Sequence, residues 1–201
     1  MNNPLPPNAT IGILGGGQLG RMLAVAASRL GLKTHIFEPG EIPPAGQVAD
    51  KVTTAPYDDH FALTAFAMSV DVITFEFENI PTHALDVLEA IRPVMPNRRA
   101  LATSQDRVTE KEFLTSLGLQ CAPYANIETS EDLTAAMEKI GAPSILKTRR
   151  FGYDGKGQSR LKPDTNPTSA WADLGNTPCV LEGFIDFTHE ISVIGARSQS
   201  G

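Results

Sequence analysis

The sequence predicts an α/β protein, with a parallel sheet covered by helices on both faces in its first half and a second, smaller domain after it. Short apolar segments alternate with amphipathic helical patterns from residue 10 to residue 96, which is typical of a parallel sheet. A glycine-rich turn joins the first predicted strand to the first predicted helix. After residue 97 the alternation stops, and a second glycine-rich loop lies between two short predicted strands.

The elements of the first half follow from the spacing of apolar residues. Helices repeat apolar residues about every 3.6 positions, whereas strands show continuous or alternating apolar runs. Gly31 ends the first helix, and Asp58 and Asp59 can cap the second one. The predicted strands are 10–14, 33–37, 71–77 and 93–96, and the predicted helices are 18–30, 58–69 and 82–91.

The second half has a different organisation, and we expect a boundary that gives domains of residues 1–104 and 105–201. Polar helical sequence after residue 97 is broken near Ser104 and stopped by Gly118. Another helix begins at Ser130 and ends at Gly141. Strands are predicted at 144–148, 157–161, 178–185 and 189–197, with a short helix near 169–174.

Composition excludes several classes of function. Of the 201 residues, 41% are hydrophobic and 20% are charged, and the net charge is −6 with a pI near 5.2. An acidic chain lacks the basic surface of a general nucleic-acid or anionic-membrane binder. Residues 1–10 do not resemble a signal peptide, and no apolar run approaches the roughly 20 residues that span a bilayer. We therefore expect a cytoplasmic protein that binds neither nucleic acid nor membrane.

The first glycine-rich turn, Gly15–Gly20, matches the pattern GxGxxG between a strand and a helix. Glycines allow a tight turn there, and a helix N-terminus offers free N–H groups to an anion. Glu38 ends the second predicted strand, where a ribose-binding acid stands in dinucleotide-binding folds. From these residues alone, NAD, another phosphate ligand and a purely structural role remain equally open.

Two carboxylates, Glu76 and Glu78, lie at the C-terminal end of the third predicted strand. Alternation along a strand would direct both to one face. Ligands of parallel sheets gather at the C-terminal ends of the strands. We favour a ligand-binding role over a solvated acidic edge.

The second glycine-rich loop, Lys147–Gln158, reads KTRRFGYDGKGQ. Glycines between two strands allow backbone N–H groups to fold over a polyphosphate. Lys147, at the end of a strand, would direct its charge toward phosphate oxygens. The loop is not a Walker loop, because GxxxxGK[ST] and a following helix are both absent. A merely flexible basic hairpin is the alternative.

Several stretches together resemble one enzyme family. LKTRRFGYDGKGQ is similar to the loop of the ATP-grasp superfamily, in the form found in 5-(carboxyamino)imidazole ribonucleotide synthetases. The stretches GILGGGQLGRMLA, TFEFENIP, QDRVTEKEFL and FTHEISVIGAR match the same family in the same order. The resemblance runs from Ile11 to the last residue. It implies a Rossmann-like first domain followed by the flap-bearing small lobe of an ATP-grasp domain, truncated before the second lobe.

The resemblance also implies an ATP site. Arg107 and Lys147 would contact the phosphates, Glu190 would accept hydrogen bonds from the ribose hydroxyls, and a flap would close over the nucleotide. The flap consists of Gly152, Tyr153, Asp154, Gly155, Lys156, Gly157 and Gln158. The strand that meets adenine consists of Glu182, Gly183, Phe184 and Ile185.

The activity implied by the family is ATP-dependent carboxylation of 5-aminoimidazole ribonucleotide with bicarbonate, in purine biosynthesis. We expect Asp154 to orient the substrate amine and take its proton, with Tyr153 assisting, which explains a carboxylate in a basic loop. The nucleotide substrate would lie against Gly17, Gln18, Leu19, Glu76 and Glu78. In this interpretation Glu38 is incidental, and the substrate phosphate suits the helix that begins near Gln18.

Some parts of the family's site have no counterpart in the sequence. Mg²⁺ would serve with ATP, but its ligands are expected outside this chain, so no metal ligand is assigned. We expect the chain alone to be inactive, and the resemblance suggests a homodimer. The alternatives are a formate-using glycinamide ribonucleotide transformylase or another ATP-grasp carboxylase, and, in a different class, an NAD-binding module.

Overall fold

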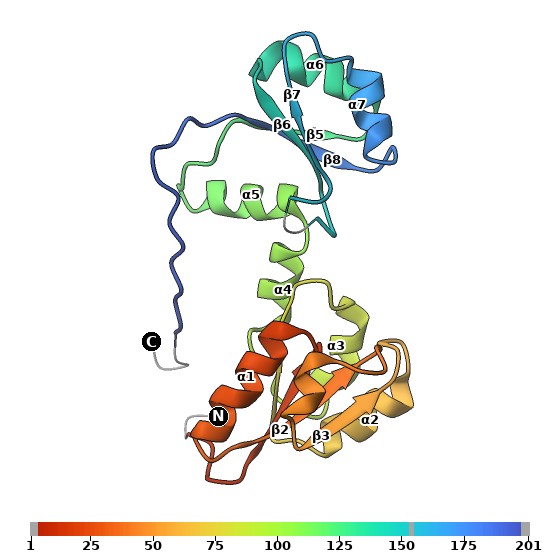
Figure 1. The fold of residues 1–201 in the computed structure, drawn as a ribbon, viewed down its shortest axis with the longest axis vertical. Helices are drawn as coiled ribbons and strands as arrows, with labels where there is room; N and C mark the ends of the chain where they lie inside the picture. The colour runs from red at the N-terminus through yellow and green to blue at the C-terminus, as the bar shows by residue number, and fades with distance from the viewer. Residues whose placement is uncertain (1–3, 153–154, 198–201) are drawn as a thin grey trace. The chain divides into compact units, whose positions relative to one another are not determined.

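The chain forms two compact units in a computed structural model, which describes residues 4–152 and 155–197 (Figure 1). The first unit contains the chain up to Ala102, and the second contains Thr103–Gly195. The first unit holds a parallel sheet and the second an antiparallel sheet, each packed against helices. The α/β class is confirmed. In the described residues, none of the helices has the length and apolar character needed to cross a membrane.

The first sheet has the strand order β3-β2-β1-β4, and all of its pairings are parallel. Its strands are β1 (Thr10–Leu14), β2 (Lys33–Glu38), β3 (Lys51–Thr54) and β4 (Val72–Phe75). The sequence did not predict β3, and it predicted β4 to run on to residue 77. The strand predicted at 93–96 is reduced to one parallel bridge between Val94 and Ile73.

Each face of this sheet has its own core, because successive strand residues point to opposite sides. Ile13 packs with Ile36 beneath α1 (Gln18–Arg29) and the 3₁₀ helix η1 (Pro44–Gln47). The neighbouring residue Leu14 enters the larger core formed with α2 (His60–Met68) and α3 (Thr82–Glu89). Leu101 of α4 (Arg98–Ser104) also belongs to that larger core.

The second sheet is antiparallel, with the strand order β5-β8-β6-β7. Its strands are β5 (Tyr124–Ile127), β6 (Ser144–Thr148), β7 (Gln158–Leu161) and β8 (Cys179–Gly183). One face packs on α6 (Ser130–Ile140) and α7 (Pro167–Asp173), and α5 (Arg107–Ser116) lies on the other side (Figure 1). A capping box between Thr129 and Asp132 fixes the start of α6.

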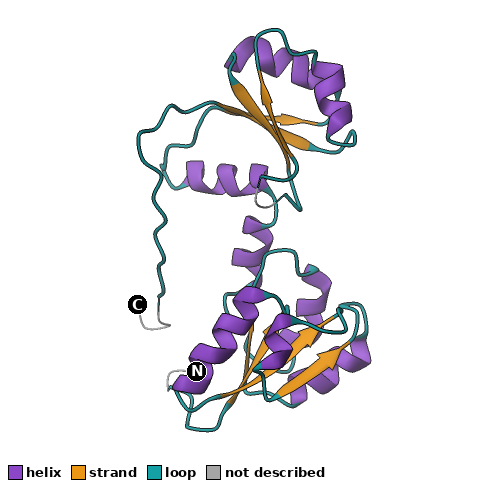
Figure 2. Cartoon of the chain, in the orientation of Figure 1, coloured by secondary structure: helices purple, strands orange, loops and turns teal. Residues whose placement is uncertain are grey.

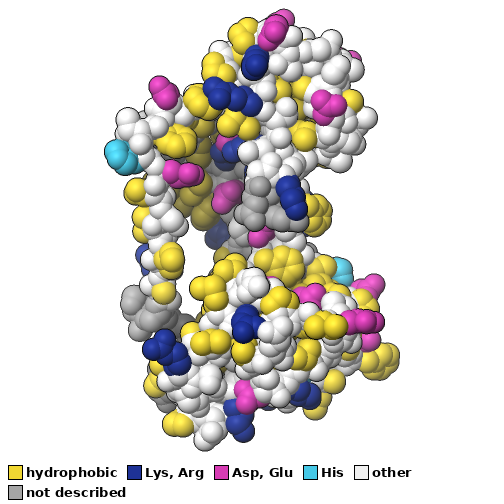
Figure 3. Space-filling model, in the orientation of Figure 1, with side chains coloured by type: hydrophobic (Ala, Val, Ile, Leu, Met, Phe, Trp, Pro, Cys, Tyr) yellow, Lys and Arg dark blue, Asp and Glu magenta, His cyan; other side chains and the backbone are white. Residues whose placement is uncertain are grey.

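After β8 the chain has no regular structure as far as residue 197 (Figure 2), so the strand predicted at 189–197 is wrong for the described chain. A strand needs a neighbour to bond its backbone groups, and the described residues supply none here. Large apolar side chains along this segment are exposed (Figure 3): Phe187, Ile191, Val193 and Ile194. β8 itself ends at Gly183, two residues earlier than predicted.

Candidate functional site

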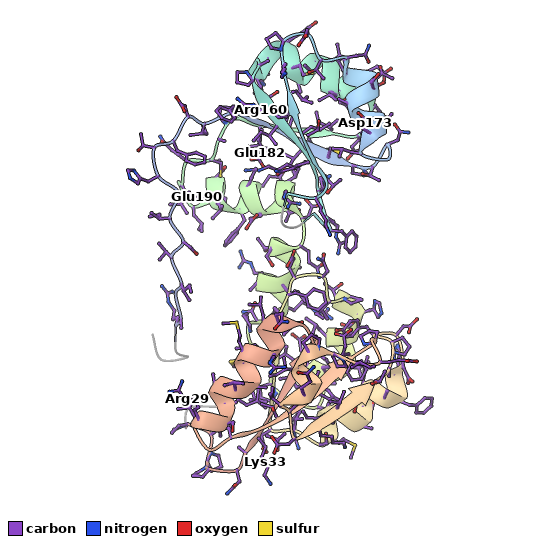
Figure 4. All side chains as sticks on the ribbon, viewed as in Figure 1. Arg29, Lys33, Arg160, Asp173, Glu182 and Glu190 are labelled. Atoms are coloured by element: carbon purple, nitrogen blue, oxygen red, sulfur yellow. The ribbon has the colours of Figure 1, made fainter. Side chains whose placement is uncertain are left out.

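The face of the second sheet that looks away from α6 carries a partly buried ion pair. Leu146 and Leu181 enter the core, so the adjacent residues Lys147 and Glu182 point to the opposite face. The ammonium of Lys147 donates to Oε2 of Glu182 at 2.9 Å, and the two side chains are 24% and 12% exposed. Figure 4 labels Glu182 on this side of the sheet. A cation and a carboxylate are therefore held together where little water reaches them.

Lys111, from helix α5, contacts the same carboxylate. Its Nζ lies 3.2 Å from Oε1 of Glu182, and its side chain is 16% exposed. The same ammonium lies 5.7 Å from the ring centroid of Tyr124, which is the register partner of Glu182 on β5. We call Lys111, Lys147 and Glu182 the charged triad. Lys111 was not among the predicted site residues, although it follows Arg107 by four positions and so shares its helix face.

Arg107 holds the base of the second glycine-rich loop. Its Nη1 donates to the carbonyl of Thr148 and its Nη2 to the carbonyl of Gly152, both at 2.8 Å. Its own backbone N–H donates to the carbonyl of Arg149 at 3.0 Å. Each terminal guanidinium nitrogen carries two N–H groups, so donors remain for a phosphate. Arg107 thus supports the loop, whatever else it binds.

The loop also closes on itself through glycine. The N–H of Thr148 donates to the carbonyl of Gly157 at 2.8 Å. Gly157 has φ +69°, and a Cβ added there would lie 2.7 Å from Oγ1 of Thr148. A Cβ added at Gly152 would meet Arg107, Thr148 and the carbonyl of Lys156 at 3.0–3.1 Å. A side chain at either position would crowd its neighbours, because the loop strands approach so closely.

Asp106 and Arg149 join the start of α5 to the end of β6. Asp106 accepts hydrogen bonds from the N–H groups of Val108 and Thr109, and Arg149 pairs with its carboxylate. Burial raises the pKa of Asp106, but the hydrogen bonds from Arg149 and the helix backbone outweigh it and hold the pKa below its ordinary value. The carboxylate therefore stays charged at neutral pH.

A cavity of about 540 Å³ lies beside this pair, away from the triad. The residues that line it include Thr148, Phe151, Leu174 and Pro178. Among the predicted site residues only Gly157 contributes to it, within the described chain. This cavity therefore does not coincide with the predicted nucleotide site.

Some of the other residues predicted to bind the nucleotide lie near the charged triad, and others do not. Gln158 begins β7 as the register partner of Lys147. The guanidinium carbon of Arg160 lies over the ring of Phe184, 4.4 Å from the ring centroid. Ile185 is exposed. Glu190 is exposed on the irregular segment after β8 (Figure 4), so the structure does not bring it to the triad. Tyr153 and Asp154 lie outside the described residues.

The first glycine-rich turn is filled by carboxylates of the chain itself. Oε1 of Glu76 accepts from the N–H of Gly17 at 2.6 Å, and its other oxygen accepts from the N–H of Gly20. Glu38 accepts from the N–H of Gly16 at 2.8 Å. The helix N-terminus thus already holds an anion. Glu38 therefore has a structural contact at this turn, between residues 22 positions apart in the sequence.

A pocket of about 370 Å³ opens at this turn, lined by glycines 16 and 17, Glu38, Glu76 and prolines 43 and 44 among others. Strand alternation was predicted to direct Glu76 and Glu78 to one face. Because β4 ends at Phe75, both residues lie beyond the strand and alternation does not apply to them. Glu78 instead accepts a hydrogen bond from the side chain of Asn79 at 3.4 Å.

Of the side chains near the turn, two predicted site residues stay outside the pocket and one tyrosine adds a proton donor. Gln18 and Leu19 are exposed and do not line the pocket. Burial, followed by the charges of Glu38 and Glu76, raises the pKa of Tyr57 well above its ordinary value. Its hydroxyl therefore stays protonated beside these two carboxylates.

The described residues contain no preformed cluster of metal-binding side chains. No group of three or more His, Cys, Asp or Glu side chains among them could hold a metal ion. Glu182, the carboxylate that the triad places near the predicted phosphates, is already paired with two lysines.

Two family models match the chain. The model of the ribonucleotide synthetase preATP-grasp domain matches residues 8–105, and that of the ATP-grasp domain matches residues 112–201. Among curated proteins, N5-carboxyaminoimidazole ribonucleotide synthase of Brucella melitensis is 50% identical over 199 residues. That match covers 98% of this chain and 55% of the relative. The enzyme of the same name from Pseudomonas aeruginosa is 41% identical, over 95% of this chain and 53% of its own.

Solved structures that resemble this chain include enzymes of the same kind. A crystal structure of N5-carboxyaminoimidazole ribonucleotide synthetase as an ADP complex has a TM-score of 0.87 at 39% identity, and the match covers 94% of this chain and 50% of that one. The structure of N5-carboxyaminoimidazole synthase from Aspergillus clavatus, in complex with ADP and 5-aminoimidazole ribonucleotide, has a TM-score of 0.79 at 28% identity, and the match covers 90% of this chain and 48% of that one. The chain spans about half the length of the relatives that it matches.

Proposed function

The chain belongs to the N5-carboxyaminoimidazole ribonucleotide synthase family, and we propose that it binds ATP for the carboxylation of 5-aminoimidazole ribonucleotide. The reaction consumes ATP and bicarbonate and gives ADP, phosphate and the carboxyamino ribonucleotide. The main support within the chain is the charged triad beside the closed glycine-rich loop, since phosphate binding needs a cation next to backbone donors.

ATP would lie on the polar face of the second sheet. Lys147 and the loop Gly152–Gln158 would hold the phosphates, with the free N–H groups of Arg107 adding to them. Residues 182–185 would meet adenine, and Glu190 the ribose, once the segment after β8 comes to the nucleotide. Lys147 supports this arrangement best, because its ammonium stands on β6 at the point where the loop begins.

The nucleotide substrate would lie at the first glycine-rich turn, in the pocket that Gly17 and Glu76 line. The other residues proposed to contact it lie outside the pocket lining: Gln18, Leu19 and Glu78. Because Glu76 already occupies the N–H groups of Gly17 and Gly20, this turn suits hydroxyl or amino donors of the substrate better than its phosphate. Asp154 would orient the substrate amine and take its proton, with Tyr153 assisting, which contributes roughly 10²–10⁴-fold in general-base catalysis.

Bicarbonate as the carboxyl donor, a homodimer and a cytoplasmic location belong to the same proposal and rest on the family resemblance. Mg²⁺ would accompany ATP through groups other than the described residues. The alternative of an NAD-binding module loses support at Gly16–Gly20, because three N–H groups that would face a pyrophosphate are taken by Glu38 and Glu76.

The test is calorimetric titration of the chain with ADP and, separately, with NAD. We expect ADP to bind, and Lys147→Met to weaken it at least about tenfold, because the phosphates lose a shielded cation. Lys139→Met is the matched control, since Lys139 is exposed on α6, across the sheet. Binding of NAD in place of ADP, or equal affinities in both variants, would overturn the proposal.

A further inference from the structure

We propose that Lys111 is a positioning residue that allows Lys147 to turn from Glu182 to a nucleotide phosphate. This inference rests on the proposed function, because it concerns the same nucleotide site. The observation behind it is that a single carboxylate contacts two ammonium groups from different elements, α5 and β6.

The two contacts of Glu182 are separate. Lys147 approaches Oε2 at 2.9 Å from the neighbouring strand, and Lys111 approaches Oε1 at 3.2 Å from the helix. All three side chains are at least three-quarters buried. The triad carries one net positive charge, so it can attract an anion while every member keeps a partner.

Charge explains why two lysines are needed. A phosphate that approaches Lys147 also brings negative charge toward the carboxylate that shares this ammonium. In a site shielded from water such repulsion is large, and a carboxylate left there without a cation is costly. Lys111 remains beside Glu182 when Lys147 turns away. The carboxylate therefore keeps its counter-charge and its place on β8.

The position of Lys111 suits this task. Arg107, one helical turn earlier on α5, holds the glycine-rich loop at Thr148 and Gly152. The ammonium of Lys111 is further fixed by the ring of Tyr124. One helix thus supports both the loop over the phosphates and the carboxylate next to them. Lys111 acts through Glu182 and need not touch the nucleotide.

The experiment compares ADP with adenosine, which has no phosphate, in calorimetric titrations of the chain and of Lys111→Met. We expect the dissociation constant for ADP to rise about tenfold and that for adenosine to change less than about twofold. Adenosine does not draw Lys147 away, so Glu182 keeps a partner in the variant. Lys111→Arg, which preserves the charge, should bind ADP like the unmodified chain, and so should the control Lys139→Met.

A second variant keeps the test decisive. In a Glu182→Gln background there is no carboxylate to neutralise, so adding Lys111→Met should leave ADP affinity unchanged. Equal losses for ADP and adenosine would show that Lys111 only stabilises α5. An undiminished loss of ADP affinity in the Glu182→Gln background would show that Lys111 acts without Glu182, and either result would make the inference wrong. If the unmodified chain bound neither ligand, the proposed function would fail first and this inference with it.

Discussion

Arg149 forms an ion pair with the carboxylate of Asp106 through two of its nitrogens, with Nε 2.9 Å and Nη2 2.7 Å from Oδ2. The same carboxylate caps α5, so one side chain fixes both a helix N-terminus and the residue that follows β6. Arg107, the next residue, holds the glycine-rich loop. The position of the loop therefore depends on the ion pair between Asp106 and Arg149, neither of which is assigned to ligand binding.

Arg149→Met should destabilise the second unit. The pair is about one-fifth exposed, so we expect a loss of about 1–3 kcal/mol in the free energy of unfolding, less than for a fully buried pair. Trp171, the single tryptophan, lies on α7 in this unit, so its fluorescence during urea unfolding reports the loss. Lys162→Met, at an exposed position, is the control. A variant as stable as the control would mean that the Asp106 pair contributes nothing.

Two glycines of the loop should respond differently to alanine. Both Gly155 and Gly157 have positive φ, +77° and +69°. Among the described residues, a Cβ at Gly155 would meet nothing nearer than 3.8 Å, so only backbone strain of about 1 kcal/mol is expected. Gly157→Ala adds the clash with Thr148 and should lose about 2–3 kcal/mol. Trp171 fluorescence measures both, and equal losses would contradict the close approach at Gly157.

Regular elements with strong local signals could be predicted from the sequence. The strands predicted at 10–14 and 144–148 coincide with β1 and β6, because continuous apolar runs between turn residues leave few alternatives. β3 and β5, four residues each, were not predicted. Such short strands lack a clear apolar pattern, and they form because a neighbouring strand offers backbone partners.

The candidate site also has features that the sequence predicts and features that depend on the fold. Motif resemblance identified Lys147 and the loop, but not that Glu182 bridges two lysines, because that arrangement depends on strand register and on where α5 packs. The contact between Glu38 and Gly16 could not be predicted for the same reason, since the two residues lie 22 positions apart in the sequence. Residues 189–197 show the opposite error, in which a strand-like sequence forms no strand without a neighbour in the described chain.

Glu76→Gln should weaken the first glycine-rich turn. Gly17 and Gly20 donate to different oxygens of Glu76, so in this geometry one of the two partly buried N–H groups would face the amide nitrogen of glutamine and lose its acceptor. We expect a loss of about 1–3 kcal/mol and faster hydrogen exchange at one of these two amides, measured by NMR. Glu41→Gln, at an exposed position nearby, is the control. Unchanged protection of both amides would contradict the role assigned to Glu76.

His35 should make the first unit sensitive to acid. Its ring is 1% exposed and bridges Ser69 and Thr53, with 2.8 Å between each ring nitrogen and its hydroxyl partner. Because the hydroxyl of Ser69 donates to the carbonyl of Phe66, Nδ1 must donate to Ser69, which leaves Nε2 as an acceptor from Thr53 in the neutral ring. Burial, followed by the charge of Lys51, lowers the pKa of His35 from 6.5 to about 4.

The unfolded chain therefore binds a proton at a higher pH than the folded chain does. The contribution of neutral His35 to stability is complete above pH 6.5 and is lost as the pH falls from 6.5 to about 4. With allowance for screening, we expect the free energy of unfolding to fall by about 2 kcal/mol over this range. Urea unfolding monitored by circular dichroism at each pH measures this loss. His35→Gln should remove this part of the acid sensitivity, whereas the exposed control His83→Gln should retain it. If His35→Gln lost as much stability as the unmodified chain between pH 7 and pH 4.5, a group other than His35 would carry the acid response.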